Sequence, residues 1–314
     1  MYRRRVGVTE PTMHEVLAGY ETMVTDTPSP SKRGPRPVPT RPSRGLVVLL
    51  FGAGSILAAC GTTSSSGNTT TTSATHQTLT IMVTNDDGVD APGIDAVVQG
   101  LRTLPDTQVT VVAPLTNQSG TGEKMTPTSA GALVTSKATT ASGYPSTAVH
   151  GYPADTVIWA VKDHGLSFRP DVVVSGINFG QNIGPLAAGS GTVGAAREAI
   201  SLGIPALAAS QGVDNGSAPD FSEAVPIVKS WVLEHRAELI DHSYDSKPPQ
   251  ANLNVPTCVG RSVRGPVTTV MAASGDAGKT TSVDCTSTSL SYANDLEAFE
   301  IGFATLTPLH PPSG

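Results

Sequence analysis

The sequence predicts an α/β fold in which helices cover both faces of a mostly parallel sheet. Short, continuous apolar runs that suit buried strands alternate along the chain with segments of helical periodicity. Hydrophobic residues make up 38% of the chain and aromatic residues only 4%, so the core must be built from Val, Ile, Leu and Ala. Uninterrupted apolar strands joined by helices are typical of parallel sheets that are buried on both faces.

The first half of the predicted domain begins at residue 79. Pro92 and Gly93 open its first helix, whose apolar residues recur every three or four positions on one face, and Pro105 ends it. Pro153 suits the first turn of a second helix. The predicted elements are a strand at 79–84, a helix from 92 to 104, a strand at 109–113, a loop with weak strands over 115–148, and a helix from 153 to about 164.

The second half repeats the alternation. Asp220 and Glu223 have the spacing of a capping box before a long helix, which Pro226 would kink. Gly203, with Pro205 beyond it, ends the preceding helix. The predicted elements are a strand at 172–174, a polar loop at 176–191, a helix at 192–202, a strand at 206–210, a helix at 221–239, and weaker strands near 251–255, 267–271 and 303–307.

The N-terminal segment has the order of an export signal. Basic residues precede a 15-residue apolar run, 45–59, which is shorter than the roughly 20 residues that a membrane-spanning helix needs. The run ends in Leu-Ala-Ala-Cys-Gly, which resembles the lipobox of bacterial lipoproteins and makes Cys60 the lipidated residue. A buried helix that ends in an incidental cysteine is the alternative. We expect a signal segment at 1–59, a Ser/Thr-rich linker at 60–78 and one domain at 79–314, held on the outer face of the cell membrane.

Charge and cysteine content narrow the functional classes. The whole chain has a net charge of −6, and without residues 1–59 it has 12 basic and 22 acidic residues, a net charge of −10. A nucleic-acid-binding protein would carry a basic patch, so nucleic acid is not an expected partner. Cys258 and Cys285 remain beyond Cys60, and in an exported protein such a pair suggests a disulfide, with two buried thiols as the alternative.

Polar loops follow the first three predicted strands, at the edge where ligands bind in parallel sheets. Asp86 and Asp87 follow the first strand, 117–120 follows the second, and 175–182 follows the third. Two adjacent carboxylates repel each other unless a cation or proton lies between them. Together with hydroxyl and amide oxygens they suit a hard cation such as Mg²⁺, Mn²⁺ or Ca²⁺. For each loop alone, a simple solvated turn is the alternative.

A glycine-rich segment, 189–194, spans the start of the helix predicted at 192–202. Free main-chain N–H groups at a helix start attract anions, and glycines would let a phosphate approach closely. Tight packing of the helix start explains the glycines equally well. An anion site beside a hard-metal site indicates hydrolysis of a phosphate ester.

Several spaced motifs resemble the SurE family of metal-dependent nucleotidases. The opening Val-Thr-Asn-Asp-Asp-Gly-Val at 83–89, followed by Ala-Pro-Gly-Ile at 91–94, is similar to the start of that family. Ser-Gly-Ile-Asn at 175–178 and Ser-Gly-Thr-Val at 190–193 resemble its second hallmark, and 117–120 its serine-bearing loop. The resemblance extends over roughly residues 79–309. Where many members carry an acidic pair and an aromatic residue, this chain has Pro-Leu-Ala-Ala-Gly at 185–189.

The resemblance implies a three-layer α/β/α, Rossmann-like fold and hydrolysis of nucleoside 5′-monophosphates, with 3′-monophosphates and short polyphosphate as further substrates of the family. It implies one Mg²⁺ or Mn²⁺ per subunit and a homo-oligomer, either a dimer or a tetramer. The catalytic residues carried over are Asp86, Asp87 and Asn178. The implied metal ligands are these three and Ser119, and the implied phosphate-binding residues are Asn182, Ser190, Gly191 and Thr192.

Rival functions fit the sequence less well. A haloacid-dehalogenase phosphatase needs a nucleophilic Asp where this chain has Asn85, and no Gly-x-Ser-x-Gly or Gly-x-Gly-x-x-Gly motif stands in the required place. A solute-binding lipoprotein without catalysis explains the anchor and the α/β pattern, but leaves the paired Asp residues unexplained. His150 and His164 are the nearest candidates for a general base, although a lone histidine is more often structural.

Overall fold

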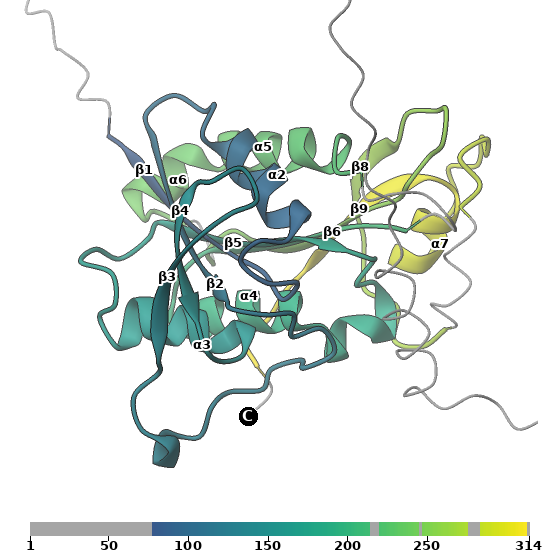
Figure 1. Cartoon of the computed structure of the whole chain (residues 1–314). Helices are drawn as coiled ribbons and strands as arrows, with labels where there is room; N and C mark the ends of the chain where they lie inside the picture. The colour runs from purple at the N-terminus through teal and green to yellow at the C-terminus, as the bar shows by residue number, and fades with distance from the viewer. Residues whose placement is uncertain (1–76, 214–219, 245–246, 276–282, 313–314) are drawn as a thin grey trace, which may run out of the picture. The chain divides into compact units, whose positions relative to one another are not determined.

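The computed structural model describes residues 77–213, 220–244, 247–275 and 283–312 (Figure 1). The predicted signal segment, the lipidation site Cys60 and all but the last two residues of the predicted linker lie outside the described residues. Within the described ranges, no helix is both long enough and apolar enough to cross a membrane.

One mixed sheet forms the centre of the described part of the chain, with the strand order β3-β4-β2-β1-β5-β6-β7-β9-β8. The strands from β4 to β7 in this order all pair in parallel, whereas β3 and β9 run antiparallel to their neighbours β4 and β7. The bounds are β1 Leu79–Thr84, β2 Thr107–Pro114, β3 Thr135–Thr139, β4 Pro145–Val149, β5 Val172–Phe179, β6 Ala206–Gln211, β7 Gln250–Val255, β8 Arg264–Thr268 and β9 Phe303–Pro308.

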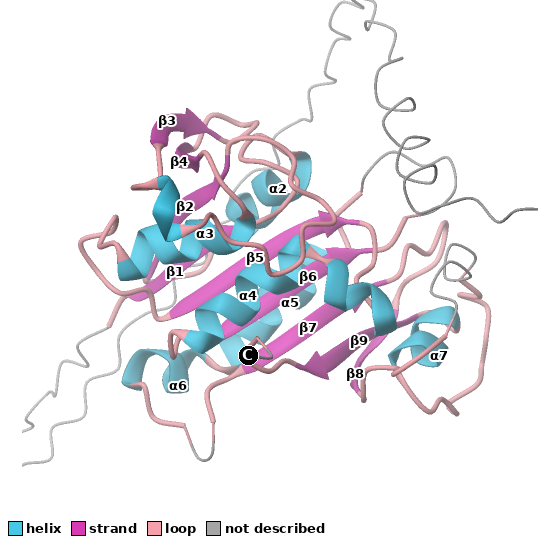
Figure 2. Ribbon diagram, turned by 90° about the horizontal axis from the view of Figure 1, so that it is seen from below, coloured by secondary structure: helices cyan, strands magenta, loops and turns pink. Residues whose placement is uncertain are grey.

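Helices cover both faces of the sheet, which makes three layers (Figures 1 and 2). The helices α2, α5 and α6 lie on one face and α3 and α4 on the other, while α7 packs on β9. The bounds are α2 Pro92–Leu101, α3 Pro153–Val157, α4 Gly191–Ser201, α5 Ala224–Glu234, α6 Arg236–Asp241 and α7 Asp295–Glu300. The predicted three-layer α/β/α fold is confirmed.

Aliphatic side chains fill both interfaces between the sheet and its helices, as the low aromatic content requires. Ile94 and Val98 of α2 pack with Val83 and Val174 of the central strands on one face. On the other face, Val193 of α4 packs with alanines of α4 and β6. Small residues there let α4 lie close to the sheet, so its first turn reaches the ends of the strands.

The strand order reverses direction between β1 and β5. The chain passes from β1 to β2 on one side, and β5 pairs with the other side of β1. In such sheets the crevice at the reversal point, outside the carboxyl ends of the strands, is where ligands bind. Asp86 and Asp87 follow β1 there, and Asn178 lies near the end of β5.

Several elements differ from the expectations. The strand β5 extends through Phe179, so the segment expected as a loop from 176 is still paired with β6, with a shift of register between Ser175 and Asn178. The π-helical turn Ile158–Lys162 completes the helix that begins at Pro153. The short helix α7 was not expected at all.

The helix expected at 221–239 is two helices, α5 and α6, which meet at His235. The expected capping box is wrong, because Asp220 accepts a hydrogen bond from the main-chain N–H of Ser222 and Glu223 makes no side-chain cap. Pro226 lies in the first turn of α5, where the proline lacks only an N–H that would have no helical partner, so no kink arises there.

Candidate active site

Four chain segments meet at the adjacent carboxylates Asp86 and Asp87. They are the turn after β1 that carries both residues, the loop after β2, the end of β5 and the first turn of α4. The main-chain N–H of Gln118, in the loop after β2, donates to the main-chain carbonyl of Asp86 at 2.7 Å. Parallel pairing brings the carboxyl ends of β1, β2 and β5 to one edge, and the loops close over that edge.

Asp86 is buried and oriented by the start of α4. Its side chain is 2% exposed, and its Oδ1 accepts a hydrogen bond from the Thr192 hydroxyl at 2.5 Å. Burial raises the pKa of Asp86, while hydrogen bonds from the Thr192 hydroxyl and from main-chain N–H groups at the helix start act against that rise.

Asp87 points toward β5. Its Oδ2 accepts a hydrogen bond from the main-chain N–H of Phe179 at 3.2 Å. Burial and, secondarily, the negative charge of Asp86 raise the pKa of Asp87 to about 7, against the lowering effect of the Phe179 N–H. Within the described residues neither carboxylate has an ion-pair partner. The pair therefore needs protons or a cation to be stable.

The residues present fit a hard divalent cation. Asn178 donates its amide N–H to the carbonyl of Gly180 at 2.7 Å, which leaves its side-chain oxygen as the atom that can bind a metal. Ser119 is exposed on the loop whose Gln118 is bonded to Asp86. The described residues contain no cluster of three or more His, Cys, Asp and Glu residues able to bind a metal, so carboxylate, amide and hydroxyl oxygens form the donor set.

Packing accounts for two glycines at the start of α4. A Cβ on Gly191 would lie 2.8 Å from the Cβ of Asp86, and one on Gly194 would lie 2.1 Å from the carbonyl oxygen of Gly122. Ser190 is the N-cap of α4, and its hydroxyl accepts from the main-chain N–H of Val193 at 3.2 Å. The structure thus places Thr192 as a positioning residue for Asp86. Phosphate contact by Ser190, Gly191 or Thr192 stays a prediction.

Asn182 is held by hydrogen bonds to the neighbouring strands β6 and β7. Its side-chain N–H donates to the Ser210 hydroxyl at 2.9 Å, and its main-chain N–H donates to the side chain of Asn254 at 2.6 Å. Its main-chain carbonyl accepts from the side chain of Asn252 at 2.8 Å. In the structure this amide joins the loop after β5 to β6, and phosphate contact by Asn182 stays a prediction.

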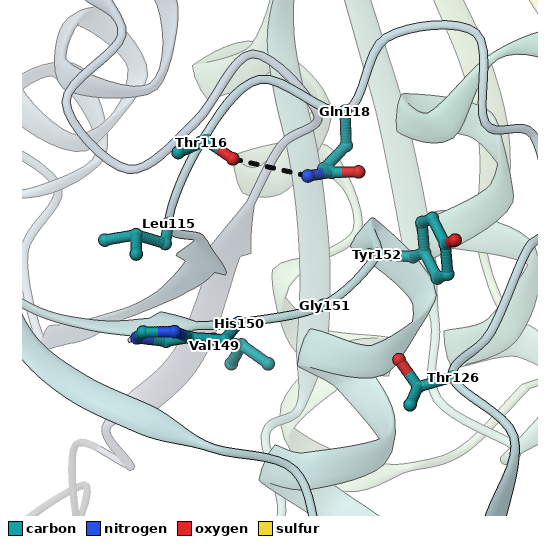
Figure 3. Close-up of a pocket in the computed structure, with 8 residues that line it drawn as sticks. All are labelled: Leu115, Thr116, Gln118, Thr126, Val149, His150, Gly151 and Tyr152. Atoms are coloured by element: carbon teal, nitrogen blue, oxygen red, sulfur yellow. Dashed lines mark hydrogen bonds between the residues drawn. The ribbon is translucent and has the colours of Figure 1, made fainter. Parts of the chain in front are cut away.

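A cavity of about 380 Å³ (Figure 3) is lined in part by Gln118, whose main-chain N–H donates to the carbonyl of Asp86. The loop after β2 and the segment after β4 form its walls. Sequence reasoning missed this cavity, because segments about thirty residues apart build it. Of its lining residues, only Gln118, within the loop 117–120, and His150, as a candidate base, were singled out from the sequence. His164 follows α3 and precedes β5, which places it toward the opposite edge of the sheet. The lining residues are Leu115, Thr116, Gln118, Thr126, Val149, His150, Gly151 and Tyr152.

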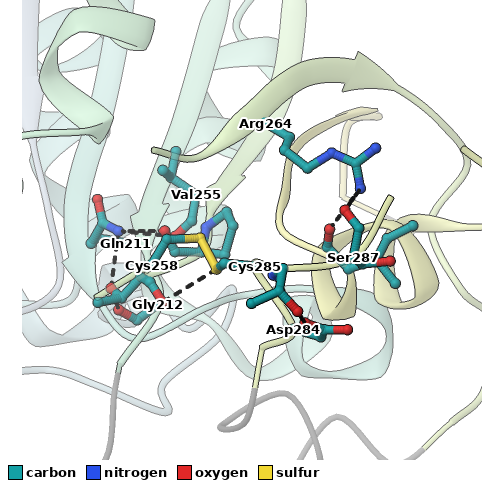
Figure 4. The surroundings of a disulfide bond; sticks show 12 residues. Gln211, Gly212, Val255, Cys258, Arg264, Asp284, Cys285 and Ser287 are labelled. Atoms are coloured by element: carbon teal, nitrogen blue, oxygen red, sulfur yellow. Dashed lines mark hydrogen bonds between the residues drawn. A yellow bond between two sulfur atoms is a disulfide. The ribbon is translucent and has the colours of Figure 1, made fainter. Parts of the chain in front are cut away.

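Cys258 and Cys285 are joined by a disulfide, with their Cα atoms 5.7 Å apart (Figure 4). The bond ties the loop after β7 to the segment that precedes α7. Gln211, at the end of β6, donates its side-chain N–H to the carbonyl of Val255 at 3.2 Å beside this bond. The C-terminal elements are thereby held to the parallel part of the sheet.

Comparisons with known proteins agree with this geometry. The model of the family described as survival protein SurE matches residues 81–276. The chain is 39% identical over 191 residues to the 5′-nucleotidase SurE of Pelobacter propionicus, covering 60% of this chain and 70% of that protein. It is 44% identical over 154 residues to the 5′-nucleotidase SurE of Desulfatibacillum aliphaticivorans, covering 49% of this chain and 58% of that protein.

A solved structure shares the fold. The crystal structure of the SurE protein from Aquifex aeolicus superposes with a TM-score of 0.56 at 27% identity, covering 74% of this chain and 93% of that chain. Since the family model matches more than half of the chain and a curated relative is matched over 70% of its length, the chain belongs to the SurE family.

Proposed function

We propose that this chain is a metal-dependent phosphomonoesterase that hydrolyses nucleoside 5′-monophosphates to nucleoside and phosphate. The observation that carries the proposal is the convergence of Asp86, Asp87 and Asn178 at the point where the strand order reverses. The names of the family relatives, 5′-nucleotidase SurE, support the expected activity.

The proposed metal is Mg²⁺ or Mn²⁺, one per subunit, held by Asp86, Asp87, Asn178 and Ser119. Such an ion would polarise a phosphoryl oxygen and lower the pKa of a bound water. Support comes from the raised pKa of both carboxylates, because adjacent acidic groups largely removed from water bind a cation in exchange for their protons.

The chain's own residues orient the reacting groups. The Thr192 hydroxyl holds Asp86, and the Phe179 N–H holds Asp87, so the two carboxylates keep fixed directions. The start of α4 contributes the positive end of a helix dipole next to Asp86, which favours negative charge there. Hydrolysis of 3′-monophosphates and short polyphosphate is a further possibility for the same site.

The test is release of phosphate from AMP by the purified protein. We expect activity with Mg²⁺ or Mn²⁺, its abolition by EDTA and its recovery when metal is added back. Equal hydrolysis in excess EDTA would contradict the metal dependence. Binding of AMP without hydrolysis, at any metal concentration, would favour the solute-binding lipoprotein instead.

We further propose that the protein is exported and held on the outer face of the cell membrane through lipidated Cys60, as a dimer or tetramer. The order of basic segment, apolar run and lipobox supports export. The disulfide between Cys258 and Cys285 agrees with an oxidising compartment. Sedimentation analysis of the purified protein tests the oligomeric state, and a single monomeric species at micromolar concentration would contradict that part of the proposal.

A further inference from the structure

The cavity lined by Gln118 and Tyr152 is large enough for a small organic group. Its volume of about 380 Å³ falls in the range of small-molecule sites, roughly 300–1,000 Å³. It lies at the carboxyl ends of β2 and β4 (Figure 3), and because β1 pairs in parallel with β2, Asp86 follows β1 at the same edge of the sheet. The cavity is therefore placed to receive the part of a substrate that extends away from the reacting phosphate.

Two contacts connect the cavity wall to the carboxylates. Gln118 lines the cavity, and its main-chain N–H donates to the Asp86 carbonyl at 2.7 Å. Tyr152 also lines the cavity, and the next residue, Pro153, packs near Asp86. A Cβ added to Gly191 would meet the Pro153 ring at 2.9 Å and the Asp86 Cβ at 2.8 Å. A molecule with its phosphate at the carboxylates can thus extend into the cavity.

The lining matches the chemistry of a nucleoside. Leu115 and Val149 supply apolar surface, while His150 and Tyr152 supply two rings. Hydroxyl and amide groups complete the wall, and none of the described lining residues is Asp, Glu, Lys or Arg. Flat heteroaromatic bases stack on aromatic side chains, and the polar groups can bond a ribose or the edge of a base. A second charged group would find no partner there.

A buried carboxylate holds the two walls of the cavity together. Asp155 is 1% exposed and accepts hydrogen bonds from the main-chain N–H and the hydroxyl of Thr126, at 2.9 and 2.6 Å. It also accepts from the main-chain N–H of Tyr152 at 2.8 Å. This clamp forms the cavity before any ligand binds, which lowers the ordering cost of binding.

We propose that this cavity is the subsite for the nucleoside part of the substrate, with Tyr152 and His150 as specificity-determining residues that contact the base. The inference rests on the proposed phosphomonoesterase activity. The inference adds that the site has two parts. One part would hold the metal and act on the phosphate, and the other, uncharged part would select nucleotides over other phosphomonoesters.

The test compares two substrates that share the reacting group. AMP and ribose 5-phosphate differ only in the base, so the ratio of their kcat/KM values reports on contact with the base. We expect Tyr152→Ala to lower this ratio by about 10-fold, the order of one lost base–aromatic stack, mainly through a higher KM for AMP. Tyr152→Phe keeps the ring and should keep the wild-type ratio. His150→Ala should lower the ratio, but by less than Tyr152→Ala does.

His310→Ala is the matched control. His310 is exposed and follows β9, which runs antiparallel to β7 and so ends at the opposite edge of the sheet. Circular dichroism verifies that each variant is folded. If Tyr152→Ala changes the kcat/KM values for AMP and for ribose 5-phosphate equally, or changes neither, the inference is overturned.

A binding measurement separates this inference from the proposed activity. Adenosine has no phosphate, so calorimetric titration of the metal-free protein with adenosine tests the cavity without catalysis. Tighter binding to wild type than to Tyr152→Ala would support the subsite even if neither phosphate ester were hydrolysed. Equal or undetectable adenosine binding by both proteins, with AMP and ribose 5-phosphate hydrolysed at equal efficiency, would refute the subsite and leave the hydrolase activity standing.

Discussion

Replacement of Asp87 by Asn should change two properties of the protein in opposite directions. The metal-free fold should become more stable at neutral and alkaline pH, because the variant removes a half-buried carboxylate that lies next to the buried Asp86. The metal-supported hydrolysis should fall, because the same change removes a charged ligand. Asn fills the same turn and can still accept the Phe179 N–H through its amide oxygen, so the fold itself should persist.

The size of the stability effect follows from the pKa. The folded state raises the pKa of Asp87 from 3.8 to about 7, so the folded protein holds this proton more tightly than the unfolded chain. The resulting stabilisation is complete below the unfolded pKa and is lost as the pH rises through about 7. Each unit of pKa difference corresponds to about 1.4 kcal/mol, so the loss of unfolding free energy reaches roughly 4 kcal/mol well above pH 7. The Asn side chain cannot ionise, so the variant loses none of this stability as the pH rises.

Urea unfolding in EDTA measures this difference. The free energy of unfolding of Asp87→Asn minus that of wild type should grow by about 2.5 kcal/mol between pH 5 and pH 8. With Mg²⁺ or Mn²⁺ present, AMP hydrolysis by the variant should fall by on the order of 10²-fold, since metal charge stabilisation amounts to several kcal/mol. Asp90→Asn is the control, because Asp90 is a nearby but exposed carboxylate. A stability difference that is constant with pH would refute the electrostatic argument, and full activity would refute the metal role.

Three further changes test separate parts of the molecule. Thr192→Val removes the hydroxyl that holds Asp86 and should lower kcat/KM for AMP by about 10-fold, whereas Thr192→Ser should retain activity. Equal rates in both variants would show that the hydroxyl does not contribute to activity. Cys258→Ser should lower the free energy of unfolding by about 2–4 kcal/mol, and non-reducing mass mapping of wild type should find Cys258 joined to Cys285, not two alkylated thiols. Cys60→Ala should release the protein from membrane fractions, and wild type found in the cytosol with residues 1–59 attached would contradict lipidation.

Local pattern alone was sufficient for the elements nearest the carboxylates. The strand β1 has the predicted bounds, and α2 begins at the predicted Pro92. Apolar periodicity and a proline at the first helical turn are properties of neighbouring residues, so they are visible without a fold. The rule that ligands bind at the carboxyl ends of parallel strands then placed Asp86 and Asp87 at the site.

Roles that depend on distant partners were not visible in the sequence. The amide of Asn182 bonds Ser210, 28 residues away, and the Thr192 hydroxyl bonds Asp86, 106 residues away. A motif indicates which side chains are present near a site, whereas their hydrogen-bond partners depend on which strands lie side by side. The packing of Gly191 against Asp86 likewise follows from how closely α4 approaches the sheet.

The sequence by itself determined the fold class, the presence of carboxylate and amide side chains at the ends of β1 and β5, and the family resemblance, because each rests on short motifs and on apolar periodicity. Only the tertiary structure decided that β5 continues through Phe179, that the predicted helix at 221–239 breaks at His235, and that a cavity forms between Gln118 and Tyr152. The physical reason is the same in each case. Strand pairing, helix docking and cavity walls depend on contacts between segments that only the folded chain brings together.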